Sequence, residues 1–300
     1  MSTEVRICQC DALDVGRVVG KERAQVVYLD PPFNVGTTFR ARDSVTVGPK
    51  TRAAGPVAYV DKWPSVEAYI SWLAPRLDAA WSIVSTDGTF WLHLDHRAIH
   101  EAKVACDRIF GKSTFLTEVI WSPGNGSKAR NFFGITHQTL LVYSKSKKPH
   151  FRPDEPLARE PFATTSLSMH FTNADAQGRK YRDRIVNGKT YRYYADEGRA
   201  LGSIWSDCPS MGANTPLRKE TTGYATQKPL RLLERIVRTC SDDGDLVVDP
   251  FCGSGTTLVA AALAGRRAIG CDVGALAIAT AAARLKGEKI RFREVAPVEC

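Results

Sequence analysis

The sequence predicts an α/β domain, doubly wound around a mostly parallel sheet and interrupted by one inserted region. Strand-like and helix-like patterns alternate along residues 1–144 and again along residues 223–300. Between them, residues 145–222 are rich in Arg, Lys, Tyr, Pro and Ser and show neither period. Two apolar strand-like runs each lead directly into a turn of Pro or Gly. We therefore expect three parts: residues 1–144, an insertion at 145–222, and residues 223–300.

The first part alternates between the two kinds of element. Apolar and β-branched runs predict strands at residues 5–10, 26–29, 89–94, 117–121 and 139–143. Amphipathic spacing predicts helices at residues 65–83 and 96–110, the first with Ser65 as its N-cap and Glu67 in its first turn. Such alternation is typical of strands that run parallel and are linked by crossover helices.

The insertion and the last part follow in the same way. Within the insertion, KYRDRIVNGKTYRYY (residues 180–194) carries Asn187-Gly188 at its centre, which predicts a hairpin turn. Strands are then expected at residues 246–248 and 268–271. Helices are expected at residues 229–240, 257–263 and 275–285, which restores the α/β alternation.

Composition excludes several classes of protein. A hydrophobic fraction of 43% and a charged fraction of 24% are ordinary for a globular chain. No apolar run approaches the ~20 residues that span a bilayer, and the N-terminus has no basic and apolar leader, so a cytoplasmic protein is expected. The eight cysteines show no CxxC pairing, which predicts neither a zinc module nor a disulfide framework. His93, His96 and His100 are close in sequence, but we expect no metal site.

The net charge of +9 is unevenly distributed. Residues 112–228 hold 18 Lys and Arg against 10 Asp and Glu, whereas the rest of the chain holds 23 against 22. One region therefore carries almost the whole excess, as expected where a protein meets a polyanion. A solvated basic surface without a partner is the alternative.

The stretch YLDPPFN (residues 28–34) places an acid and two prolines directly after a strand. Ligands of open α/β sheets bind beyond the carboxyl ends of strands, where Asp30 is expected. Pro31 and Pro32 have a fixed φ and no N–H, so they stiffen the turn and present carbonyl acceptors. Phe33 adds an aromatic face. The structural alternative is a rigid turn in which Asp30 caps backbone groups.

The stretch DLVVDPFCGSGTT (residues 245–257) reads as a strand, a glycine-rich turn and the start of a helix. Glycines allow close approach of a ligand, and a helix N-terminus favours an anionic or polar one. The turn lacks the Lys-Ser/Thr of a phosphate-binding loop and the third glycine of the dinucleotide fingerprint. Asp272, about 20 residues beyond the turn, is placed to bind ribose hydroxyls. A nucleoside without phosphates suits this arrangement.

These motifs together resemble the β-class amino DNA methyltransferases. DPPF resembles their catalytic motif, and DPFCGSGTT between TQKPLRLLERIV and GRRAIGCD resembles their cofactor half. VDKWPSVEAYISWLAPRL, GTFWLHLDHRAIHEAKVACDRIFG and TEVIW are also similar, so the likeness covers nearly everything outside residues 150–200. The catalytic motif precedes the cofactor turn, which is the circularly permuted order of this class. The resemblance implies a Rossmann-like methyltransferase sheet and S-adenosylmethionine as cofactor.

The resemblance also implies roles for individual residues. An exocyclic amine of a flipped base would donate to the Asp30 carboxylate and the Pro31 carbonyl, with Phe33 stacking on the base. Lys228 belongs to the TQKP segment that closes over the methionine of the cofactor. The catalytic set is therefore Asp30, Pro31, Pro32 and Phe33, and the cofactor set is Asp11, Thr226, Lys228, Asp249, Phe251, Gly253, Ser254, Gly255, Thr256 and Asp272. Asp11 is expected near the adenine and Asp272 at the ribose.

Adenine N6 is the expected target, because members that act on cytosine N4 more often carry Ser in place of the acid. Cytosine N4 is the second reading. Methyl transfer to RNA or to a protein amide is another, although such enzymes usually begin the motif with Asn and place it after the cofactor turn. A DNA-binding protein that has lost catalysis is the last alternative. Intact Asp30, Phe33 and the glycine turn at 253–255 argue against it.

Double-stranded DNA is the expected partner, and the inserted region is the candidate for target recognition. Its cations can neutralise phosphates, while Asn, Gln and Arg side chains can read base edges. The resemblance suggests a homodimer and a cognate restriction endonuclease as further partners. The expected nucleic-acid contacts are Lys145, Lys147, Lys148, Arg179, Lys180, Arg182, Arg184, Lys189 and Arg192.

Overall fold

A computed structural model describes residues 4–41, 55–124, 129–211 and 220–296. The chain forms two compact units, which are described separately. The larger unit combines the chain up to Phe151 with the chain from Ser203 onward, and the smaller unit is Arg152–Gly202. Within the described ranges, no helix is both long and apolar enough to cross a bilayer.

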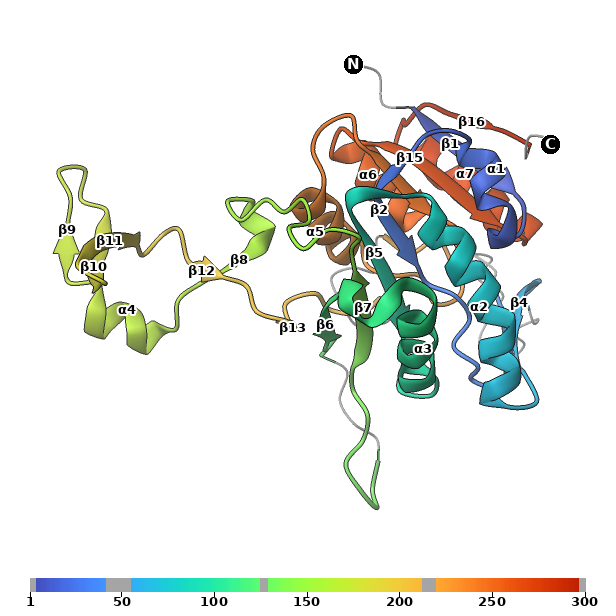
Figure 1. Cartoon of the computed structure of the whole chain (residues 1–300), viewed down its shortest axis with the longest axis horizontal. Coiled ribbons are helices and arrows are strands. Elements are labelled where there is room, and N and C mark those ends of the chain that lie inside the picture. Colours follow the sequence, from blue (N-terminus) through green and yellow to red (C-terminus); the bar gives the residue numbers. More distant parts are fainter. Residues whose placement is uncertain (1–3, 42–54, 125–128, 212–219, 297–300) are drawn as a thin grey trace, which may run out of the picture. The chain divides into compact units, whose positions relative to one another are not determined.

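A nine-stranded sheet forms the centre of the larger unit (Figure 1). Its order is β13 (Ile204–Trp205), β6 (Phe115–Trp121), β7 (Gln138–Tyr143), β5 (Val84–Leu94), β2 (Ala24–Leu29), β14 (Leu246–Asp249), β15 (Arg267–Asp272), β1 (Val5–Gln9) and β16 (Phe292–Glu294). Among the strands of this sheet that the structure describes, β7 alone runs antiparallel to its neighbours. The predicted mostly parallel sheet is therefore confirmed.

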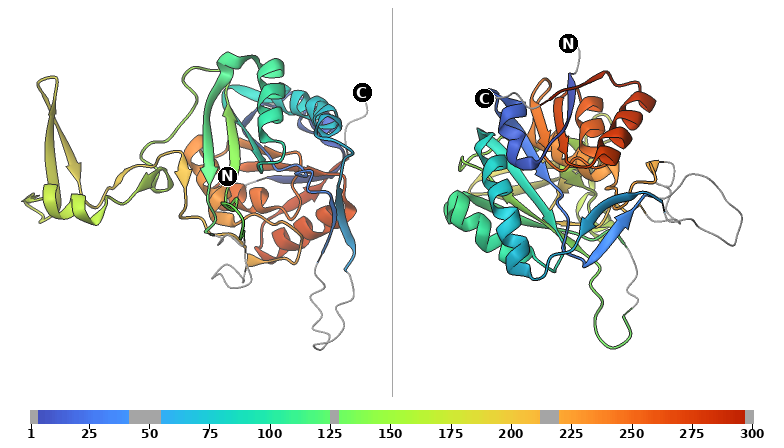
Figure 2. Two further views of the ribbon diagram at one scale, coloured as in Figure 1. Left: turned by 90° about the horizontal axis from the view of Figure 1, so that it is seen from below. Right: turned by 90° about the vertical axis from the view of Figure 1, so that its right-hand side faces the viewer.

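Helices cover both faces of the sheet, as Figures 1 and 2 show. One face carries α1 (Val15–Val19), α2 (Val66–Ser82) and α3 (Ile99–Cys106), and the other carries α5 (Leu230–Cys240), α6 (Thr256–Leu263) and α7 (Ala275–Gly287). Ser65 caps α2 as predicted, since its hydroxyl accepts a hydrogen bond from the Ala68 amide. The helix expected at residues 96–110 begins later, at Ile99, and continues past Cys106 as a π-helical turn. The doubly wound arrangement is confirmed.

The smaller unit holds a three-stranded antiparallel sheet and a short helix. Its elements are β8 (Arg159–Glu160), α4 (Thr164–His170), β9 (Asn173–Ala174), β10 (Lys180–Val186), β11 (Lys189–Tyr194) and β12 (Arg199–Ala200). The predicted hairpin joins β10 and β11, and both turn residues, Asn187 and Gly188, have positive φ (50° and 75°). Such angles define the two-residue turn that matches the twist of antiparallel strands.

The smaller unit is narrower than the insertion expected at residues 145–222. Residues 145–151 and 203–211 belong to the larger unit. The second of these segments adds β13 to the sheet edge through parallel pairing of Ile204 with Ile120. Two residues are too short a strand to produce a recognisable period in the sequence.

Candidate active site

Three neighbouring parallel strands bring acidic side chains to one edge of the sheet. Asp30 follows β2, Asp249 ends β14 and Asp272 ends β15, and these strands are adjacent in that order. All three carboxylates line one cavity, together with aromatic side chains and the glycine turn. The cavity therefore lies at the carboxyl edge, where ligands of open α/β sheets bind.

A further acid, Asp61, holds the turn that carries Asp30. Asp61 ends β4 (Val57–Asp61), and its carboxylate accepts hydrogen bonds from the amides of Phe33 (3.1 Å) and Asn34 (2.5 Å). The Pro32 carbonyl accepts from the Tyr69 hydroxyl at 2.7 Å. The sequence reasoning missed Asp61, although an acid within the apolar run VAYVDKW is a signal that could have been used. The turn is thus fixed from both sides.

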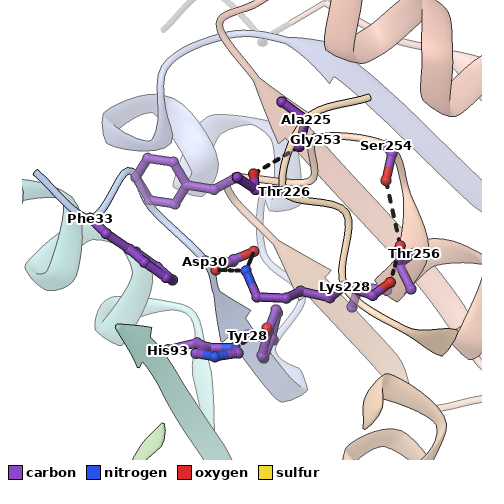
Figure 3. Close-up of polar contacts among 12 residues, drawn as sticks. Tyr28, Asp30, Phe33, His93, Ala225, Thr226, Lys228, Gly253, Ser254 and Thr256 are labelled. Atoms are coloured by element: carbon purple, nitrogen blue, oxygen red, sulfur yellow. Dashed lines mark hydrogen bonds and ion pairs between the residues drawn. The ribbon is translucent and has the colours of Figure 1, made fainter. Parts of the chain in front are cut away.

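Among the described residues, the Asp30 carboxylate bonds to a side chain and to no backbone group, in contrast to the structural alternative. Both of its carboxylate oxygens accept from the Lys228 ammonium, at 2.6 and 2.5 Å (Figure 3). The same ammonium lies 4.9 Å from the centre of the Phe33 ring. Burial raises the pKa of Asp30 above its ordinary value, and the charge and hydrogen bonds of Lys228 oppose that rise.

The strand next to β2 supplies a buried histidine below this group. The Tyr28 hydroxyl and His93 Nδ1 are 2.7 Å apart, and the His93 ring lies 5.9 Å from Phe33 (Figure 3). Burial and the nearby Lys228 charge hold the pKa of His93 well below its usual range, so the ring is neutral. His96 and His100 are exposed, and within the described ranges no three potential ligands gather as a metal site would require. His93 therefore belongs to the packing around Phe33.

The glycine turn is tied to the two other acids. Asp249 accepts from the Phe251 amide (3.0 Å) and the Thr257 hydroxyl (2.6 Å). Burial raises the pKa of Asp249 to about 7, against the effect of these two bonds. Asp272 accepts from the Gly253 amide at 3.0 Å. These carboxylates bind backbone and hydroxyl donors and so shape the turn itself.

The walls of the cavity match an adenosyl and amino-acid ligand. Aromatic and aliphatic side chains supply flat apolar surface, and Asp272 supplies acceptors for hydroxyl groups. Gly253 has a positive φ of 49°, and a Cβ on it would lie 3.4 Å from the Tyr224 ring. The sequence reasoning missed several lining residues: Tyr28, Tyr59, Trp72, Tyr224, Gln227 and Val273. Tyr224 and Gln227 stand within five residues of Lys228, and Val273 follows Asp272, so these three were within reach of the motifs.

A family model described as DNA methylase matches residues 24–283, from the Asp30 strand through the glycine turn and beyond it. The chain belongs to this DNA methylase family. S-adenosylmethionine is accordingly the methyl donor of this methylase, and the cavity described above has the acceptors and apolar walls that such a cofactor needs.

Curated relatives align along most of the methylase. The chain is 29% identical to Type II methyltransferase M.EcaI of Enterobacter cloacae over 87% of its own length and spans 64% of that relative. It is 26% identical to Type II methyltransferase M1.MboII of Moraxella bovis, covering 90% of the chain and 92% of the relative. The DNA adenine methyltransferase YhdJ of Escherichia coli (strain K12) is 23% identical, with 88% and 76% covered.

Solved structures share the fold. An M1.HpyAVI–SAM complex has a TM-score of 0.53 at 17% identity, covering 94% of this chain and 98% of that one. The PvuII cytosine-N4-specific DNA methyltransferase has a TM-score of 0.59 at 16% identity, covering 95% and 87%. Both confirm the Rossmann-like α/β fold of the methylase.

The structure gathers most of the expected catalytic and cofactor residues around the cavity. Pro31, Phe33, Asp11 and Gly255 are not among the described residues that line it. Ten expected residues line it: Asp30, Pro32, Thr226, Lys228, Asp249, Phe251, Gly253, Ser254, Thr256 and Asp272. Asp11 instead caps a 3₁₀ turn through the Leu13 amide and pairs with Arg76, 2.6 Å away. The Arg76 guanidinium lies 4.3 Å over the ring of Trp72, which lines the cavity. Asp11 therefore contacts the cavity only indirectly, through Arg76 and Trp72.

Two of the three expected nucleic-acid contacts in the larger unit, Lys145 and Lys147, donate hydrogen bonds to backbone carbonyls of the protein. Lys145 Nζ donates to the Val84 carbonyl at 2.7 Å and lies 5.2 Å from the Trp81 ring. Lys147 Nζ donates to the Ser113 carbonyl. Lys148 is exposed.

In the smaller unit, acids compensate several of the cations. Arg179 pairs with Asp196 (2.9 Å) and Glu197 (3.0 Å), and Arg192 pairs with Asp183 (2.9 Å). Arg182 lies over the rings of Phe162 and Phe171. The exposed cations Lys180, Arg184 and Lys189 sit on or beside the hairpin strands.

Proposed function

We propose that this methylase transfers a methyl group to the N6 amine of a flipped adenine in double-stranded DNA. The observation that carries the proposal is Asp30, an aspartate carboxylate at the edge of the cavity that also contains the glycine turn. From there the Asp30 carboxylate can accept a hydrogen bond from an amine that lies beside a bound methyl donor. We also infer the circularly permuted motif order of the β class, since the Asp30 turn precedes the glycine turn in the chain.

The proposed catalysis depends on orientation and charge. One amine N–H donates to Asp30 and the other to the Pro31 carbonyl, which aims the nitrogen lone pair into the cavity. S-adenosylmethionine, when bound, supplies an electrophilic methyl group on a sulfonium. Holding two reactants in such a geometry can supply about 7–11 kcal/mol of the barrier. As the nitrogen–methyl bond forms, the electrons of the methyl–sulfur bond would return to sulfur and leave a neutral thioether. The Asp30 carboxylate would stabilise the positive charge that develops on the amine nitrogen, which would then release one proton to Asp30 or to water.

Other residues complete the proposed site. The Phe33 ring offers a face on which the extruded base stacks, which recovers about 1–3 kcal/mol. Thr226, held at a positive φ of 58°, bonds to the Tyr59 hydroxyl at 2.9 Å. This bond joins the segment before Lys228 to β4, so both can cover the cofactor cavity and keep water out.

The target base is tested by mass spectrometry of nucleosides from DNA of cells expressing the chain. N6-methyladenine is expected, because Asp30 stands where N4-specific members more often carry Ser. Cells expressing Asp30→Asn are the control and should yield much less of the modified base. N4-methylcytosine in place of N6-methyladenine would overturn the adenine assignment. Sequencing that detects modified bases then gives the recognised sequence.

An aromatic pair supports a DNA-facing role for the loop between β6 and β7. Phe132 and Phe133 are 82% and 89% exposed, with ring centres 5.2 Å apart, and Arg130 is exposed beside them. Since β6 runs parallel to β5 and β2, this loop leaves the sheet at the Asp30 edge. Exposed aromatics near cations suit insertion between bases or stacking on them. We assign this loop a contact with the duplex at the flipped base.

Replacing both Phe132 and Phe133 with Ala should weaken duplex binding by at least about tenfold, since each base stack is worth about 1–3 kcal/mol. Fluorescence anisotropy with a labelled duplex measures the loss. Leu263→Ala, which truncates an exposed apolar residue of α6, is the matched control and should bind normally. Unchanged affinity of the double variant would contradict the assignment.

Further parts of the proposal concern the cellular setting. We assign target recognition to the smaller unit and the residues around it, on the strength of the exposed hairpin cations Lys180, Arg184 and Lys189. A homodimer, a cognate restriction endonuclease and a cytoplasmic location complete the proposal. They rest on the resemblance and on relatives named as Type II methyltransferases.

A further inference from the structure

We propose that Lys228 is a positioning residue whose ammonium group takes the place of the target amine on Asp30 and is exchanged for that amine when the base enters. This deepens the proposed function and rests on it. The family likeness of the TQKP segment implied only a cofactor contact for this lysine. The role proposed here follows from what its ammonium touches.

Lys228 makes the two contacts that the target base is expected to make. Its ammonium donates to both oxygens of Asp30, at 2.6 and 2.5 Å, as the target amine would donate to one of them. It also lies 4.9 Å from the centre of the Phe33 ring, the proposed stacking face (Figure 3). The side chain is 8% exposed, so a base reaching Asp30 meets Lys228 there. Two N–H donors cannot occupy one position.

The backbone of Lys228 is fixed while its side chain has a long stem. The Lys228 carbonyl accepts from the Thr256 hydroxyl at 3.2 Å, and Thr256 in turn accepts from Arg284 at 2.6 Å. The four-carbon stem of lysine has several rotatable bonds, so the ammonium can leave Asp30 without movement of the backbone. A backbone held by Thr256 of α6 and a flexible side chain together allow the Lys228 ammonium to move between two positions.

Exchange would serve the reaction in two ways. A buried carboxylate without a partner tends to take up a proton, and the Lys228 ammonium keeps Asp30 ionised until the amine arrives. During transfer the amine nitrogen gains positive charge, and an ammonium still on both Asp30 oxygens would repel it. Withdrawal from at least one oxygen therefore favours the transition state over the resting arrangement.

The decisive test observes the lysine directly. The full chain, labelled with ¹⁵N at lysine Nζ, gives a Lys228 signal that is assigned by its loss in Lys228→Arg. Asp30→Asn should move this signal, because it removes the charge that holds the ammonium. A duplex with the mapped target adenine should also move it. The same duplex with purine, which lacks the amine, at that position should move it much less.

Two results would overturn the proposal: a Lys228 signal that the adenine duplex leaves unmoved, or equal shifts with adenine and purine. Kinetics give a second readout. Lys228→Met should lower kcat at least tenfold, a larger effect than its effect on cofactor affinity, and Lys228→Arg should recover part of the loss in kcat. A Lys228→Met variant with full kcat contradicts the role. If nucleoside analysis instead reports N4-methylcytosine, cytosine and 2-pyrimidinone replace adenine and purine, so failure of the base assignment is distinguished from failure of the exchange.

Discussion

Asp30→Asn is expected to lower kcat by about 10²–10³-fold or more, the range seen when one preorganised electrostatic contact to a transition state is removed. Asn keeps the volume of the side chain and one acceptor oxygen but loses the charge that stabilises the developing positive nitrogen. Cofactor affinity should stay within twofold, because the described bonds of the glycine turn involve Asp249 and Asp272 instead. Single-turnover transfer of labelled methyl to duplex DNA, with calorimetric cofactor titration, separates the two effects.

Asp78→Asn is the matched control for this prediction. Asp78 is an exposed acid on α2, so the same chemical change there should leave kcat unaltered. An Asp30→Asn enzyme with kcat near that of Asp78→Asn would refute the role of the Asp30 carboxylate in methyl transfer. Loss of cofactor binding in Asp30→Asn would instead indicate that Asp30 acts mainly in binding the cofactor.

Asp61→Ala should lower kcat by about 10²-fold, the effect expected from misplacing a reacting group by about 1 Å. Asp61 is 1% exposed and accepts from the Phe33 and Asn34 amides. Alanine leaves both donors without an acceptor, which costs about 1–3 kcal/mol for each buried N–H and lets the Asp30 turn relax. Thermal unfolding and kcat measured on the same preparation report the stability and positioning effects together.

Asp61→Asn gives a graded comparison, because its amide oxygen can still serve one of the two donors. We expect its kcat to fall between those of the parent and Asp61→Ala. Cofactor affinity should change little in either variant, since Asp61 is not among the described residues that line the cavity. Equal kcat in the parent and Asp61→Ala would show that the turn holds its geometry without this acid.

The sequence by itself determined the features that depend on neighbours in the chain. Alternating strand and helix patterns fixed the doubly wound sheet, and Asn187-Gly188 fixed the hairpin because only certain residues adopt two consecutive positive φ angles. The acid at the end of β2 and the glycines before α6 were likewise recognisable, because each motif is a short continuous segment whose chemistry is local.

Only the tertiary structure decided which distant groups share a site. Lys228 meets Asp30 across 198 positions of the chain, and Asp61 reaches the Phe33 amide across 28. Folding also paired Arg179 with Asp196, so this arginine contributes less unpaired positive charge than its place in the basic region had indicated. Hydrogen bonds and ion pairs act over a few ångströms in space, whereas residue patterns report only separation along the chain. The partners of each charge therefore became visible only in three dimensions.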